Sequence, residues 1–143
     1  MTCKQVSVFL ENRKGSLAAV CKILGDAGIN MLALSIAETD NYGICRMILS
    51  DNDKGMEALK KAGYTVRITP VLVVCVPDRP NGLADVLTII DKENISVEYL
   101  YSFVRNSGFD ALLIFRLSDA AAAEKALLAN YVKILSEEQI RQL

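Results

Sequence analysis

The chain has 143 residues, of which 52% are hydrophobic and 23% are charged, so it can bury a sizeable core and is not a disordered polymer. Its 16 lysines and arginines nearly balance 17 acidic residues, which argues against nucleic acid or an anionic membrane surface as a partner. Histidine is absent and the four cysteines form no C-x-x-C pair, which argues against a zinc site and against Ser-His-Asp or Cys-His catalysis.

The start of the chain, MTCKQVSVFL, shows no apolar secretory signal with a cleavage site. The most apolar run covers residues 71–76 and is far shorter than the roughly 20 apolar residues that cross a bilayer. We therefore expect a cytoplasmic protein without a membrane segment, in which the cysteines stay reduced and act as small buried hydrophobic side chains.

The first half of the chain predicts a strand, a helix, a hairpin of two strands, a second helix and a last strand. Apolar residues spaced i, i+3, i+4 and i+7 from Leu17 indicate the first helix, and Gly28 ends it in a left-handed conformation. The second helix follows the capping residues 51–53 and ends at Ala62, before Gly63. The other elements are expected at residues 5–10, 16–27, 29–37, 43–50 and 64–69.

The second half of the chain repeats the first. A shift of 66 positions aligns them, and the shift grows to 68 by Ser118 because the second half has a longer turn around residues 105–108. Asn94 replaces Gly28 at the helix end, and asparagine is the next-best residue for the left-handed conformation. The identical pairs are Val8 and Val74, Arg13 and Arg79, Leu17 and Leu83, Ala18 and Ala84, Val20 and Val86, Ile23 and Ile89, Ile29 and Ile95, and Leu34 and Leu100.

Each half therefore has the β-α-β-β-α-β order of a ferredoxin-like α+β unit, with four antiparallel strands and both helices on one face. We place the two units at residues 1–70 and 71–143, with Pro70 at the junction, and a capping box at 136–139 predicts a short C-terminal helix. The elements of the second unit are expected at residues 71–76, 82–93, 95–104, 111–117, 120–129 and 132–134.

The strand at residues 111–117 is apolar on both faces. Leu113, Phe115 and Leu117 point one way, and Leu112 and Ile114 point the other. An uncovered second face would be a large apolar patch, so we expect a second sheet to pack on it, most simply that of a second copy of the chain. The sequence thus predicts a homodimer through the sheet face.

The turn between the first strand and the first helix carries a further signal in both units. It reads Asn12-Arg13-Lys14-Gly15-Ser16-Leu17 in the first unit and Asp78-Arg79-Pro80-Asn81-Gly82-Leu83 in the second. With the repeat and the order of elements, this resembles the ACT domain, a regulatory module of amino-acid metabolism whose turn reads roughly N/D-x-P-G-x-L. Lys14 stands where that pattern has proline, and the second turn has one extra residue between Pro80 and Gly82.

The resemblance implies that the two units pair side by side into an eight-stranded antiparallel sheet with helices on one face. It also implies that a free amino acid binds between the units, at the turn of one unit and the start of the second strand of its neighbour. A helix N-terminus suits the carboxylate of such a ligand. The candidate ligand-binding residues are Asn12, Arg13, Lys14, Gly15, Ser16, Leu17, Asn30, Met31, Asp78, Asn81, Gly82, Leu83, Ser96 and Val97.

These observations predict a regulatory sensor of an amino acid that modulates a partner enzyme of amino-acid metabolism. The alternative is a non-catalytic interaction subunit without ligand binding, since both turns depart from the family pattern. We expect no catalytic residue, metal or cofactor, because no nucleophile, base and orienting group occur together. Alternating Tyr99, Tyr101 and Phe103 resemble an RNA-stacking platform, but a buried sheet interface accounts for them better at this charge balance.

Overall fold

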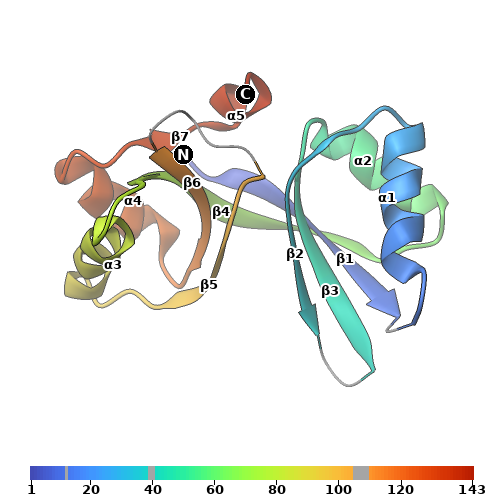
Figure 1. Cartoon of the computed structure of the whole chain (residues 1–143), viewed down its shortest axis with the longest axis horizontal. Helices are drawn as coiled ribbons and strands as arrows, with labels where there is room; N and C mark the ends of the chain where they lie inside the picture. The colour runs from blue at the N-terminus through green and yellow to red at the C-terminus, as the bar shows by residue number, and fades with distance from the viewer. Residues whose placement is uncertain (12, 39–40, 105–109) are drawn as a thin grey trace. The chain divides into compact units, whose positions relative to one another are not determined.

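The computed structural model describes residues 1–11, 13–38, 41–104 and 110–143. These residues form two compact units, an N-terminal unit of Lys4–Thr69 and a C-terminal unit of Pro70–Leu143 together with Met1–Cys3 (Figure 1). Asn12, part of the predicted hairpin turn at 39–40 and the longer turn at 105–108 lie outside the described residues.

The N-terminal unit has the predicted β-α-β-β-α-β order, and its strands pair antiparallel in the order β2-β3-β1-β4. Both helices cover one face of this sheet (Figure 1). The elements are β1 (Cys3–Glu11), α1 (Ser16–Asp26), β2 (Met31–Glu38), β3 (Tyr42–Leu49), α2 (Asn52–Lys61) and the first part of β4 (Val66–Pro77).

The core of the N-terminal unit follows from the two periodicities in the sequence. Alternate residues of β1 face the helices, and α1 turns Val20 and Leu24 onto them. Each fully buried side chain of this size stabilises the fold by about 1.5–3 kcal/mol relative to an exposed one. The buried cluster consists of Val6, Val8, Leu10, Val20, Leu24, Ile29, Cys45, Met47, Leu49 and Leu59.

The C-terminal unit repeats this arrangement, with a core built from the equivalent positions, among them Val74, Val86 and Ile90. The second part of β4 pairs with β6 on one side and with β7 on the other, and β6 pairs with β5. The further elements are α3 (Gly82–Lys92), β5 (Val97–Ser102), β6 (Asp110–Leu117), α4 (Ala120–Ala129), β7 (Ile134–Leu135) and α5 (Glu137–Arg141).

The junction between the repeats differs from the prediction. The strands expected at 64–69 and 71–76 are one continuous strand, β4, so the described residues contain seven strands rather than eight. Proline fits this because its fixed φ is compatible with extended backbone, and only its N–H is missing. The carbonyl of Pro70 accepts a hydrogen bond of 3.0 Å from the Arg116 guanidinium. Pro70 therefore lies within a strand and not in a turn.

The predicted helix ends are confirmed at the level of backbone conformation. Gly28 has φ 74° and Asn94 has φ 57°, so both residues end their helices in the left-handed region. The capping box of α5 is also formed, because Ser136 and Gln139 exchange side-chain to backbone hydrogen bonds of 3.2 and 2.9 Å.

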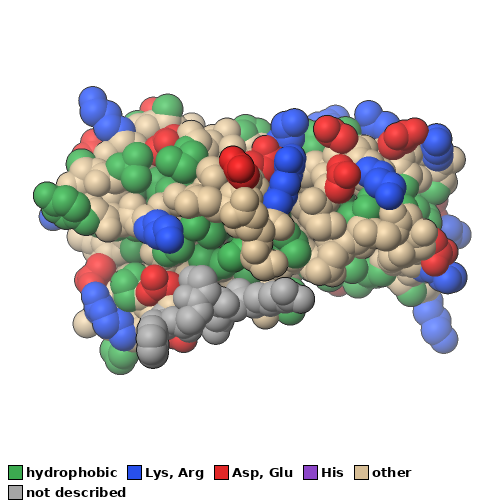
Figure 2. All heavy atoms as spheres, turned by 90° about the horizontal axis from the view of Figure 1, so that it is seen from above, with side chains coloured by type: hydrophobic (Ala, Val, Ile, Leu, Met, Phe, Trp, Pro, Cys, Tyr) green, Lys and Arg blue, Asp and Glu red, His purple; other side chains and the backbone are tan. Residues whose placement is uncertain are grey.

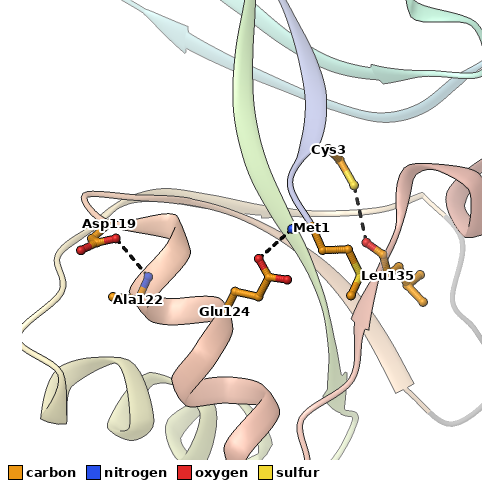
Figure 3. A network of polar contacts seen from close by, with 6 residues as sticks. All are labelled: Met1, Cys3, Asp119, Ala122, Glu124 and Leu135. Carbon is orange, nitrogen blue, oxygen red and sulfur yellow. Dashed lines mark hydrogen bonds and ion pairs between the residues drawn. The ribbon is translucent and has the colours of Figure 1, made fainter.

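Met1–Cys3 belong with the C-terminal unit, although Lys4 onward belongs to the other. The terminal amino group of Met1 lies 2.7 Å from a carboxylate oxygen of Glu124, and the Cys3 thiol donates to the carbonyl of Leu135 at 3.5 Å (Figure 3). Glu124 belongs to α4, and Asp119 caps this helix by accepting a hydrogen bond from the N–H of Ala122 at 3.0 Å. The start of the chain thus contacts both α4 and β7.

The two faces of β6 are both buried within one chain. Phe115 and Leu117 join the core beneath the helices, as the alternation predicts. Leu112 and Ile114, on the other face, are only 1% and 0% exposed. Leu112 and Ile114 therefore leave no exposed apolar patch on β6 for a second copy of the chain to cover. The predicted homodimer assumed such a patch on this strand, and that assumption was wrong.

Burial of cysteine thiols gives the fold a testable dependence on alkaline pH. Burial raises the pKa of Cys45 to about 12 and that of Cys3 to about 11, from an ordinary value of 9.0. The folded protein keeps these protons at a pH where the unfolded chain releases them, so the free energy of unfolding should fall as the pH rises above about 9.

Urea denaturation between pH 8 and about 11 measures this dependence. Cys45→Ala should be less stable at pH 8, because it leaves a small cavity, but should lose less stability with rising pH. An identical pH dependence of the variant and the wild-type protein would contradict the assignment.

Candidate functional site

The turns that precede α1 and α3 end in the same backbone conformation. Gly15 and Asn81 are the N-cap residues and have φ 89° and φ 66°, both left-handed. The next residue begins the helix in each case. Each turn also contains the same backbone hydrogen bond. The N–H of Ser16 donates to the carbonyl of Arg13 at 3.3 Å, and the N–H of Gly82 donates to the carbonyl of Arg79 at 3.0 Å.

The extra residue expected between Pro80 and Gly82 does not lengthen the second turn. Asn81 occupies the position that Gly15 has in the first turn, and asparagine tolerates the left-handed conformation. Gly82 instead starts α3, where a Cβ atom would lie 2.0 Å from the carbonyl oxygen of Pro77. The glycine of the second turn is therefore required for close backbone approach and not for a positive φ.

Helices α1 and α3 lack the side-chain caps that the other helices have. Asp51, Asp119 and Ser136 each accept a hydrogen bond from the first turn of α2, α4 and α5. Gly15 and Asn81 make no such bond. The N–H groups of Ser16 and Gly82 are paired within the turns, but no N-cap side chain accepts from the N–H groups that follow them. Such groups and the partial positive charge of a helix N-terminus attract carboxylates, so these two helix starts have the chemistry of an anion site.

The matching arginines of the two turns are both exposed and make local ion pairs. Arg13 lies 3.2 Å from Glu11, whereas Arg79 lies 3.1 Å from Asp85 and also donates to the carbonyl of Pro80 at 3.0 Å. Exposed pairs of this kind contribute about 1 kcal/mol or less. The exposed Lys14 and Asp78 lie in the same turns.

A hollow of about 310 Å³ lies beside the turn of the N-terminal unit. Arg13 and Ser16 line it together with Gly63, Tyr64 and Thr65, which connect α2 to β4. Leu17 lines a smaller hollow of about 110 Å³ on the hairpin side of the same turn.

The C-terminal unit has an equivalent hollow of about 320 Å³. It is lined by Arg79 and Gly82 from the turn and by residues 131–133 from the connection of α4 to β7. Sequence reasoning missed these connecting residues in both units. The repeat contained the signal, since Gly63, Tyr64 and Thr65 align with Tyr131, Val132 and Lys133 at the shift of 68.

The predicted residues at the start of the second strands do not lie with the turn of their own unit. Asn30 and Ser96 are at the other end of an 11-residue helix, about 16 Å from its start. Their backbone N–H and C=O groups pair with Ser50 and Ser118 at 2.9–3.0 Å. Met31 follows Asn30, and Ser96 and Val97 line a separate hollow of about 690 Å³ beside α3.

The described residues contain no group of three or more His, Cys, Asp or Glu side chains that would hold a metal ion. No helix in the described part of the chain is long and apolar enough to cross a membrane.

Charged side chains of both signs are interspersed on the face that Figure 2 shows, without a single basic patch. Tyr101 in β5 and Phe103, which follows β5, are buried at 8% and 6% exposure, so these rings form no open stacking platform.

A family model described as an ACT domain pair matches residues 1–143. The crystal structure of a Bacteroides thetaiotaomicron protein has a TM-score of 0.93 and 38% identity, covering 100% of this chain and 98% of that chain. The ligand-free regulatory subunit of aspartate kinase from Thermus thermophilus has a TM-score of 0.65, with 18% identity over 90% of both chains. The Thermus flavus subunit has a TM-score of 0.61 and 14% identity over 90% of this chain and 92% of that chain. Both subunits share the fold. No curated protein matches the sequence.

Alanine substitution tests whether the left-handed N-cap shapes the turn. Gly15 and Gly25 both have open space where a side chain would begin, but only Gly15 has a positive φ. Gly15→Ala should therefore lower the free energy of unfolding by about 1–2 kcal/mol. Gly25→Ala, inside α1, should raise it by about 1 kcal/mol. Urea denaturation measures both, and equal effects of the two substitutions would refute a left-handed Gly15.

Proposed function

Because the chain belongs to the family of ACT domain pairs, we propose that it is a regulatory sensor that binds a free amino acid and modulates a partner enzyme of amino-acid metabolism. One observation carries the proposal. Two repeat-related turns each end in a helix start without a side-chain cap and border a hollow of about 310 or 320 Å³. Pockets for small ligands begin at about 300 Å³.

The proposed ligand-binding residues lie in the two turns and at the starts of the second strand of each unit. The turns Arg13–Leu17 and 78–83 supply helix N–H groups for a carboxylate. Asp78 in the second turn is an acceptor for the ammonium group. The further proposed contacts are Asn30, Met31, Ser96 and Val97, at the starts of β2 and β5.

Regulation requires that the amino acid prefers one state of the chain over another. Similarity to the regulatory subunits of aspartate kinase supports a role in which this chain acts on a catalytic partner and performs no catalysis itself. We also propose a homodimer through a sheet face. Tyr42 supports it, since the residue is 47% exposed and its ring centroid lies 6.3 Å from that of Phe9 on the helix-free face of the N-terminal unit.

An interaction subunit that binds no ligand is the second candidate. The observation that favours it is that both turn arginines already have partners, Glu11 for Arg13 and Asp85 for Arg79. Binding of a partner enzyme that is the same with and without amino acids would support this candidate.

Thermal unfolding in the presence of each of the twenty amino acids tests the proposed function. A ligand at 100 times its dissociation constant should add about 2.7 kcal/mol to the stability of the folded state. If no amino acid raises the unfolding temperature, the chain is not an amino-acid sensor.

Introducing an aspartate at each helix start tests which of the two turns binds the ligand. Ser16→Asp and Ala84→Asp place a negative charge at the start of α1 or α3, which stabilises the helix by about 0.3–1 kcal/mol but repels a ligand carboxylate. The variant at the turn that binds should lose the ligand-induced shift. Ala121→Asp, exposed in the first turn of α4, is the control and should keep it. A shift retained by both turn variants would exclude the helix starts as the site.

A further inference from the structure

The connection of α4 to β7 contains an outlier at Tyr131. This residue has φ 61° and is 98% exposed. The aligned residue of the N-terminal unit is Gly63, with φ 91°. A left-handed conformation costs a residue with a Cβ about 1–2 kcal/mol, and an exposed ring returns nothing to the fold. Glycine would serve folding better here, and the exposed tyrosine ring is available to contact a ligand.

Tyr131 lies at the hollow of about 320 Å³ in the C-terminal unit. Apolar side chains form part of its lining, including Cys75, Pro77, Val86 and Ile89. Its volume is at the lower end of the range for small-molecule sites and suits a ligand of the size of one amino acid.

Two opposite charges flank this lining from neighbouring strands. Cys75 N–H donates to the carbonyl of Lys133 at 2.9 Å on one side of β4, and Pro77 pairs with Asp110 on the other side. Both charges act on the Cys75 thiol. Burial raises its pKa, and Lys133 lowers and Asp110 raises it. In the part of the chain that the structure describes, neither Lys133 nor Asp110 forms an ion pair, whereas Arg79 and Asp85 pair with each other.

Lys133 and Asp110 lie at different levels along β4. Lys133 is beside Cys75, whereas Asp110 is opposite Pro77, two residues further along, and both residues line the same hollow. The Lys133 ammonium and the Asp110 carboxylate belong to segments on opposite sides of β4, so they suit the carboxylate and the ammonium group of one zwitterion through charge-assisted hydrogen bonds.

The N-terminal unit lacks every part of this arrangement. Thr65 stands in place of Lys133, and Tyr42, opposite Glu11, stands in place of Asp110. Phe9 replaces Cys75, and its ring lies 5.4 Å from the Arg67 guanidinium. The two equivalent hollows therefore differ in charge, although their turns share one backbone conformation.

We propose that in the C-terminal unit alone Lys133 and Asp110, in place of the α3 helix start and Asp78, bind the carboxylate and the ammonium group of one free amino acid above Cys75, with the ring of Tyr131 packing on the ligand. The ligand class rests on the proposed function, but the site lies inside a single unit. It therefore binds one ligand per chain.

Calorimetry with the amino acid that gives the largest thermal shift tests this site. Loss of a hydrogen bond to a charged group weakens binding by about tenfold or more, so Lys133→Thr and Asp110→Asn should each do so. Lys125→Thr, exposed on α4, is the matched control and should not. The amine that lacks the ligand carboxylate and the acid that lacks its ammonium group should both bind weakly.

Tyr131→Gly separates binding from folding. It restores the residue of the other repeat, so it should raise the unfolding temperature by about 2–4 °C while weakening the binding of the amino acid. Asn94→Gly, at φ 57°, is the control that relieves a similar conformation and should leave affinity unchanged.

The outcomes distinguish the two proposals. An amino acid that binds the wild-type chain and the Lys133→Thr and Asp110→Asn variants equally would overturn the Lys133–Asp110 site but leave the sensor function standing. Binding of two ligands per chain with equal affinity would also overturn a site confined to the C-terminal unit. If no amino acid binds the wild-type chain, both proposals fail.

Discussion

The left-handed residue that precedes α1 and α3 is the constraint on which the rest of the site depends. It turns the chain directly from a strand into a helix, so that the first helical N–H group pairs within the turn and no N-cap side chain accepts from the next ones. Gly15 meets this constraint without steric cost, and Asn81 meets it at a small cost. The remaining helices begin after a capping side chain, so their N-termini have no comparable chemistry.

A shared backbone with different side chains explains how the two repeats can diverge in function. The hydrogen bonds of the two turns are the same, and both turns border hollows of nearly equal size. The difference lies in what surrounds them: Phe9 and Thr65 in one unit, Cys75 and Lys133 in the other. Divergence of this kind leaves the shared core intact, because Phe9 and Cys75 lie outside the buried clusters beneath the helices of the two units.

Much of the candidate site was predictable from sequence, because a turn is a local structure. The residues from Arg13 to Leu17 and from Asp78 to Leu83 lie in turns that begin a helix, as their pattern indicates. Tyr131 and Lys133 could not be found in this way, since no short-range rule brings the end of α4 beside the start of α3. Only the packing of the sheet does so, through the hydrogen bond of Cys75 to Lys133.

The sequence by itself determined the repeat, the order of elements and most helix ends, because hydrophobic periodicity and capping residues act over a few positions. Only the tertiary structure decided that β4 continues through Pro70, that Met1–Cys3 pack with α4 and β7, and that Leu112 and Ile114 are buried within one chain. These features depend on contacts between residues far apart in the chain. Such contacts are stabilised by burial and pairing with residues far away in the chain. The residue pattern of a short segment does not specify which distant residues these are.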